Sequence, residues 1–142
     1  MRALIALLLL AVPAQAWDFT PIPVCTIAKD TPTLLVRVTF DPSRPEPYAI
    51  SLTRPEPWPL TDSFGLRFDG PQAMTIGTAR HRVSNDGRIL TVSDTGFGNV
   101  LDGLAQNTTA TALAGGAEVP VDLTGAEPAV EAFRACGVVP SA

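Results

Sequence analysis

The chain has little of what zinc and cofactor sites are usually built from. Its 142 residues include one histidine, His81, and two cysteines, and Lys29 is the one lysine among ten basic residues. One histidine and two cysteines cannot supply the usual tetrahedral zinc ligands. The sequence also lacks the glycine spacings of phosphate and dinucleotide loops, the G-x-S-x-G elbow and the H-E-x-x-H pair. We therefore expect no metal and no cofactor.

Positive charge is scarce and has no long run. The formal net charge is −4, and the densest basic stretch is Arg80-His81-Arg82. Binding to phosphate backbones or to anionic lipid surfaces requires a larger basic patch. Nucleic acid is therefore not an expected partner.

Long apolar runs are absent after the first residues. Met1-Arg2 precedes the apolar run 3–12, and Ala14-Gln15-Ala16 follows it. This is the pattern of a secretory signal peptide, and the run is too short for the roughly 20 residues that span a bilayer. We expect a signal peptide over residues 1–16 and one secreted β-rich domain over residues 17–142. That domain should be periplasmic or extracellular and should not insert into a membrane.

The two cysteines lie near opposite ends of this predicted domain. Cys25 and Cys136 are too far apart in sequence for a C-x-x-C redox pair. An even number of cysteines in a secreted chain normally forms disulfides. We expect a Cys25–Cys136 disulfide, which closes a loop of about 100 residues and restricts the unfolded chain by roughly 4 to 5 kcal/mol in the entropy model.

Apolar residues alternate with polar ones along most of the chain, which is the period of a half-buried strand. The alternating sets are Leu34, Val36, Val38 and Phe40; Tyr48, Ile50 and Leu52; Phe64, Leu66 and Phe68; Met74 and Ile76; Leu90 and Val92; and Val119, Val121 and Leu123. Hairpin turn signals separate them at Asp69-Gly70-Pro71, Asn85-Asp86-Gly87-Arg88 and Gly115-Gly116. The pattern predicts a mainly antiparallel fold.

Two segments have helical spacing instead. Val100, Leu101 and Leu104 form a stripe within about residues 98–107, with Asn99 available as the N-cap. A second stripe falls within about residues 126–136, preceded by capping-box spacing from Thr124 and with a proline in its first turn. We predict a mainly β fold, an antiparallel β-sandwich or small barrel with two short helices.

One internal repeat occurs, Arg44-Pro45-Glu46-Pro47-Tyr48 followed by Arg54-Pro55-Glu56-Pro57-Trp58. Proline removes main-chain donors, so neither copy can be a central strand. One interpretation is that the copies protect a sheet edge from pairing with another chain. The other is a docking face for an envelope protein or peptide, with Arg44, Tyr48, Arg54 and Trp58 as partner-binding residues, because aromatic residues and arginine are enriched at binding hot spots.

Asp94-Thr95-Gly96 follows an apolar strand segment and resembles the active-site loop of retroviral-type aspartic proteases. The resemblance implies a homodimer in which two copies of Asp94 share one proton, with Thr95 orienting the loop and Gly96 admitting the substrate backbone. The alternative is a strand-to-helix turn in which Asp94 or Thr95 caps nearby main-chain N–H groups.

The order of elements carries a second resemblance. An early cysteine, alternating strands, a short helix at Val100-Leu101-Asp102-Gly103-Leu104 and the segment Val121-Asp122-Leu123-Thr124-Gly125 before a last helix are similar to small bacterial periplasmic proteins of the invasion-associated locus B type. That resemblance implies a non-enzymatic β-sandwich and supplies no catalytic residue. The leading hypothesis is a non-enzymatic periplasmic or extracellular binding or envelope-interaction protein. The alternative is the Asp94 protease.

Overall fold

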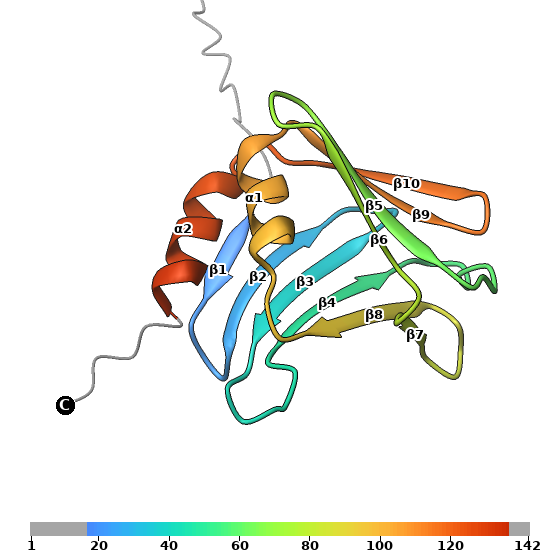
Figure 1. Cartoon of the computed structure of the whole chain (residues 1–142), viewed down its shortest axis with the longest axis horizontal. Helices are drawn as coiled ribbons and strands as arrows, with labels where there is room; N and C mark the ends of the chain where they lie inside the picture. The colour runs from blue at the N-terminus through green and yellow to red at the C-terminus, as the bar shows by residue number, and fades with distance from the viewer. Residues whose placement is uncertain (1–16, 137–142) are drawn as a thin grey trace, which may run out of the picture.

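The computed structural model describes residues 17–136, which fold into two antiparallel sheets and two short helices (Figure 1). The six-stranded sheet has the order β1 (Asp18–Thr20), β2 (Cys25–Asp30), β3 (Leu35–Phe40), β4 (Tyr48–Thr53), β8 (Ile89–Asp94) and β7 (Arg82–Val83). The four-stranded sheet has the order β10 (Ala117–Asp122), β9 (Thr109–Ala114), β5 (Phe64–Asp69) and β6 (Met74–Thr78). The predicted mainly β, antiparallel fold is confirmed. Each sheet has an edge strand at both ends and does not close on itself, so the prediction of a small barrel as the alternative is wrong.

The register of the six-stranded sheet sorts its side chains onto two faces. Ile27 pairs with Val38, Val38 with Ile50, and Ile50 with Val92. The first three of these residues are buried, and this face forms one wall of the core. The opposite face carries mostly small and hydroxylic residues, as the period of two requires. Its central members are Thr39, Ala49, Ser51, Thr91 and Ser93.

The four-stranded sheet supplies the other wall of the core. Phe64, Leu66 and Phe68 of β5 are buried. They pair with Ala114, Ala112 and Ala110 of β9, respectively. The alanines leave room beside the aromatic rings, and large and small residues thus alternate across neighbouring strands.

The hairpin turns fall where the glycines predict them. Gly115 and Gly116 have φ values of 53° and 86° and join β9 to β10. Gly87, with a φ of 77°, lies in the turn before β8. Positive φ is strained for residues with a Cβ atom, so glycine fixes these turns.

The two helices pack together at one end of the sheets, with α2 (Ala126–Cys136) beside β1 and β2 and α1 (Gly98–Gln106) beside α2 (Figure 1). Both predicted helices are present, but the caps predicted for them are wrong. Phe97 occupies the N-cap position of α1 without a side-chain hydrogen bond, so the prediction of Asn99 as the cap is wrong. The Thr124 hydroxyl donates to Asp122 Oδ1 at 2.7 Å instead of forming the expected capping box.

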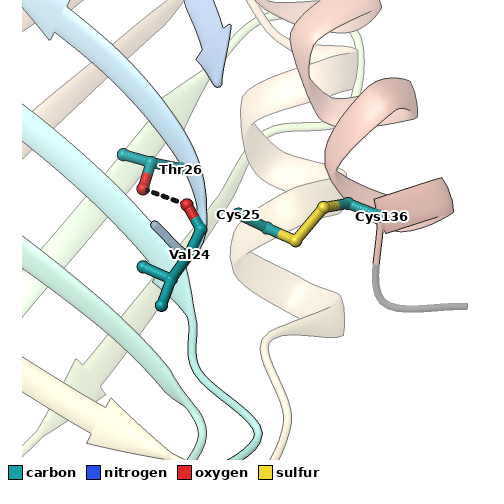
Figure 2. Close-up of a disulfide and its surroundings, with 4 residues drawn as sticks. All are labelled: Val24, Cys25, Thr26 and Cys136. Atoms are coloured by element: carbon teal, nitrogen blue, oxygen red, sulfur yellow. Dashed lines mark hydrogen bonds between the residues drawn. A yellow bond between two sulfur atoms is a disulfide. The ribbon is translucent and has the colours of Figure 1, made fainter. Parts of the chain in front are cut away.

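The predicted disulfide is present and joins the start of β2 to the end of α2 (Figure 2). The Cα atoms of Cys25 and Cys136 are 6.2 Å apart and 111 residues apart in sequence. Beside it, the Thr26 hydroxyl donates to the Val24 carbonyl at 2.9 Å. The bridge fixes α2 against the six-stranded sheet.

Within residues 17–136, neither helix is long and apolar enough to cross a bilayer. The predicted signal peptide, residues 1–16, lies outside the described residues, as do residues 137–142 of the predicted domain.

Candidate binding cleft

A cleft of about 410 Å³ opens between the two sheets where β6 and β8 lie on the same side of the molecule. Its walls are mainly apolar side chains from both sheets, among them Ile50 and Val92 on one side and Leu66 and Ile76 on the other. Ligand sites are typically hollows of about 300–1,000 Å³ with apolar walls and a few polar groups. The cleft has this size and this composition.

The cleft stays open because the strands on its two sides do not pair. β6 is the last strand of its sheet, and β7 is only two residues long. β7 pairs only with Leu90 and Thr91 of β8. Within the described chain, residues 92–94 of β8 therefore have β4 along one edge and no paired strand along the other. Ile76 and Val92 consequently remain half-buried, although their side chains are on the inner faces of the sheets.

Two charged side chains, Arg80 and Asp94, line the cleft, and a third, Glu46 of the neighbouring hollow, bonds to Arg80. Arg80, just after β6, forms ion pairs with Glu46 of the β3–β4 loop and, at 3.9 Å, with Asp94 at the end of β8. All three side chains are substantially solvent-exposed, at 60%, 41% and 47%, respectively. One guanidinium therefore faces two carboxylates, and this rim has an excess of negative charge.

Within the protease triplet, Asp94 is the residue that forms an ion pair at this rim. Its Oδ1 accepts from the Thr95 main-chain N–H at 2.7 Å, and no bond links it to the N–H groups of residues 96–99. Asp94 therefore bonds one nearby main-chain N–H group, as the turn interpretation expects, but it does not cap α1. Its ion-pair partner in the described chain is Arg80. Gly96 lines the cleft, whereas Thr95 is exposed outside it.

The first copy of the proline repeat packs its aromatic residue, Tyr48, half-buried against the core. Tyr48 begins β4 on the inner face, and its ring centroid lies 4.8 Å from that of Phe40, 5.7 Å from Phe97 and 6.3 Å from Phe133. This aromatic cluster joins β3, β4, α2 and the N-cap residue of α1. Tyr48 is therefore a packing residue and not the exposed anchor that the sequence suggested.

The second copy is also turned inward. Trp58 is only 3% exposed, its indole N–H donates to the Leu52 carbonyl at 3.0 Å, and the Arg54 guanidinium lies 5.0 Å from the ring centroid. The predicted docking face built on Trp58 is wrong because the ring and its polar N–H are both satisfied internally. Edge protection is wrong as well, since β4 is a central strand between β3 and β8.

Of the four predicted partner-binding residues, Arg44 is the one with a mostly exposed side chain, at 72%. It lines a second hollow of about 470 Å³ under the β3–β4 loop, with Thr39, Ser51 and Thr91 on the sheet. Asp41 shapes this loop, and the hydrogen bond from the Ser43 hydroxyl, followed by that from the Ser43 main-chain N–H, lowers the pKa of its carboxyl. Charged and hydroxylic side chains make up more of the lining of this hollow than of the cleft between the sheets, although Val24 and two prolines also line it.

The single histidine lies near the cleft but does not line it. His81 Nε2 is 3.1 Å from the Thr61 carbonyl, and its ring packs against Phe64. Its Nδ1 is the one buried side-chain polar atom without a hydrogen-bond partner in the described part of the chain. Residues 17–136 contain no group of three or more metal-ligating side chains.

No protein-family model, curated protein or solved structure matches the chain. The geometry of the cleft is what supports a function.

Sequence reasoning missed the cleft, and of its lining residues it named only Asp94 and Gly96 as candidate site residues, for another reason. The sequence of β6 contained a signal that could have pointed to this cleft. The segment Met74–Thr78 contains no charge and no proline, which is unusual for a strand at the edge of a sheet.

Proposed function

We propose that this protein is a non-enzymatic binding protein of the periplasm or the extracellular space, and that its ligand inserts apolar groups into the cleft between the two sheets. The observation that carries the proposal is the set of half-buried apolar side chains, Ile76 and Val92 above all, that neither sheet covers. Covering apolar surface stabilises a complex by roughly 25 cal/mol per Å² before the costs of association.

The disulfide supports the proposed compartment. Disulfides persist in oxidising environments and are rare in the reducing cytosol. The predicted signal peptide and the resemblance to invasion-associated locus B proteins are consistent with the same assignment. The surroundings of Asp94 do not favour the protease alternative, because its carboxylate pairs with a guanidinium.

The test is a titration of the oxidised chain with Nile red, a neutral apolar dye whose emission rises when it leaves water. Val92→Trp should fill the cleft and weaken dye binding at least about tenfold, since the larger side chain occupies the ligand's volume. The matched control is Ile89→Trp, on the opposite face of β8. We expect the control to bind the dye as the wild type does.

A wild-type chain that leaves the dye in water would contradict the proposal. So would equal binding by both tryptophan variants, because the dye would then lie elsewhere. Far-ultraviolet circular dichroism of each variant checks that the β fold is retained.

A further inference from the structure

The free edge of β6 differs from the other edges of the two sheets. β1 has three residues and begins with Asp18, β7 has two residues, and β10 contains Glu118 and Pro120. Short length, charge and proline are the usual means of preventing an edge from pairing with another chain. β6 has five residues, Met74–Thr78, and none of these protections. It is therefore the edge strand of the described chain that is best suited to accept another strand.

The register shows which main-chain groups β6 offers. Ala114 and Ala117 flank the two-residue turn between β9 and β10, and residues in that position exchange both main-chain hydrogen bonds. Ala114 therefore directs its main-chain groups toward β10, and its partner Phe64 directs its own toward β6 and Thr78.

Alternation along β6 then gives the orientation of its other residues. Because Thr78 points its main-chain groups toward β5, Ile76 does the same, and Thr75 and Gly77 point theirs away from the sheet. Both of these residues are exposed. Their N–H and C=O groups form the edge that an incoming strand would meet.

The side chains of an added strand would meet the cleft. Met74, Ile76 and Thr78 are half-buried on the inner side of β6, and Ile76 and Thr78 line the cleft. An extended chain beside β6 directs every second side chain to the same face. Those side chains would lie over the uncovered apolar walls, and the others would face solvent.

Charge at the rim favours a basic group on the incoming chain. Beyond the end of β6, Arg80 is opposed by both Glu46 and Asp94. A second copy of this chain would bring another β6, which has no basic residue, and its own net charge of −4. A peptide with a lysine or arginine next to its apolar residues complements the rim better than a second copy does.

We propose that the ligand is an extended peptide segment, with apolar residues at alternate positions and a basic residue at one end, which adds to β6 as a fifth strand of the four-stranded sheet. This inference rests on the proposed function, since the same cleft receives the apolar side chains. It specifies that main-chain hydrogen bonds to Thr75 and Gly77 contribute to the affinity.

The test uses the full oxidised chain and a fluorescein-labelled peptide of about six residues, the usual strand length, in which valine alternates with threonine and the last residue is lysine. Fluorescence anisotropy should show saturable binding. Thr75→Pro should weaken binding at least about tenfold, because proline removes the outward N–H without disturbing the bonds to β5. The matched control Thr75→Ala keeps this N–H and should bind within about twofold of wild type.

A second measurement does not depend on any variant. N-methylation of the peptide on alternate main-chain nitrogens, made in both registers, should abolish binding in one register and spare it in the other. Equal binding by both N-methylated peptides, or by Thr75→Pro and wild type, would overturn strand addition.

The dye titration separates the two proposals. If Nile red binds in the cleft and the peptide does not bind, the cleft function stands and the peptide inference fails. If neither binds, both fail. A concentration-dependent dimer in sedimentation velocity that Thr75→Pro abolishes would show that β6 pairs with a second copy, and this too would overturn the peptide inference.

Discussion

The indole N–H of Trp17 donates a hydrogen bond of 2.9 Å to the main-chain carbonyl of Asp122, 105 residues further along the chain. Trp17 is 5% exposed, so this contact joins the first described residue to the end of β10 from within the core. The Asp122 carboxylate in turn accepts from the Thr124 N–H at 2.8 Å, which holds the turn before α2. Asp122 therefore connects the first described residue to the turn that precedes α2.

Trp17→Phe should lower the free energy of unfolding by about 1 kcal/mol, because it removes this hydrogen bond but keeps an aromatic ring. Trp17→Ala should cost about 3–5 kcal/mol, as expected for removing a large buried side chain. Urea unfolding monitored by circular dichroism measures both values. A Trp17→Ala variant as stable as Trp17→Phe would show that the ring does not contribute to the core.

Gly103→Ala should destabilise the protein although alanine favours helices. A Cβ atom at this position would lie 2.4 Å from a ring atom of Phe68, which is fully buried. Overpacking of this kind costs about 1–3 kcal/mol and exceeds the gain of up to about 1 kcal/mol from helix propensity. The melting temperature should fall.

The control for this substitution is in the same helix. A Cβ atom at Gly98 would meet nothing within 4 Å, so Gly98→Ala should leave the melting temperature unchanged or raise it. Equal effects at the two positions would mean that Phe68 does not limit the approach of α1.

Acid should weaken the turn before α2. The hydrogen bond from the Thr124 hydroxyl, and then that from the Thr124 N–H, lowers the pKa of Asp122 below its ordinary value of 3.8. A carboxyl with a lowered pKa in the folded state contributes stability that is complete above the ordinary value and is lost as the pH falls through the lowered one. Urea midpoints between about pH 5 and pH 2 should therefore fall for the wild type.

Asp122→Asn keeps an acceptor oxygen but does not titrate. Its urea midpoint should fall less over the same pH range. Asp41 and Asp86 still titrate in this variant, and hydrogen bonds from the Ser43 and Ser84 hydroxyls, respectively, lower their pKa values most. A variant that follows the wild-type profile at every pH would rule out a contribution from Asp122.

The sequence pattern predicted the strands whose inner residues are large and apolar. Val36, Val38, Ile50 and Leu52 repeat with a period of two, and all four are buried. The shorter strands β1 and β7, with three and two residues, were not predicted because they are too short to show a period.

The repeat was misinterpreted because local composition does not reveal which side chains pack against a residue in the folded protein. Prolines around Tyr48 and Trp58 do mark loops, as expected. However, both rings turn inward. The indole N–H of Trp58 donates to the carbonyl of Leu52, which lies six residues earlier in the chain. The cleft could not be predicted for a related reason. It depends on which strands are neighbours, and the alternation pattern carries no information about the order of strands in a sheet.

The Cys25–Cys136 bridge makes a covalent ring of every residue from the start of β2 to the end of α2. A protease that cuts one exposed turn within this ring, such as Asn85–Arg88, would leave both fragments attached to each other. The cut protein would migrate as one species on a non-reducing gel and as two after reduction. The turns of this protein can therefore be mapped by limited proteolysis one cut at a time, without loss of either fragment.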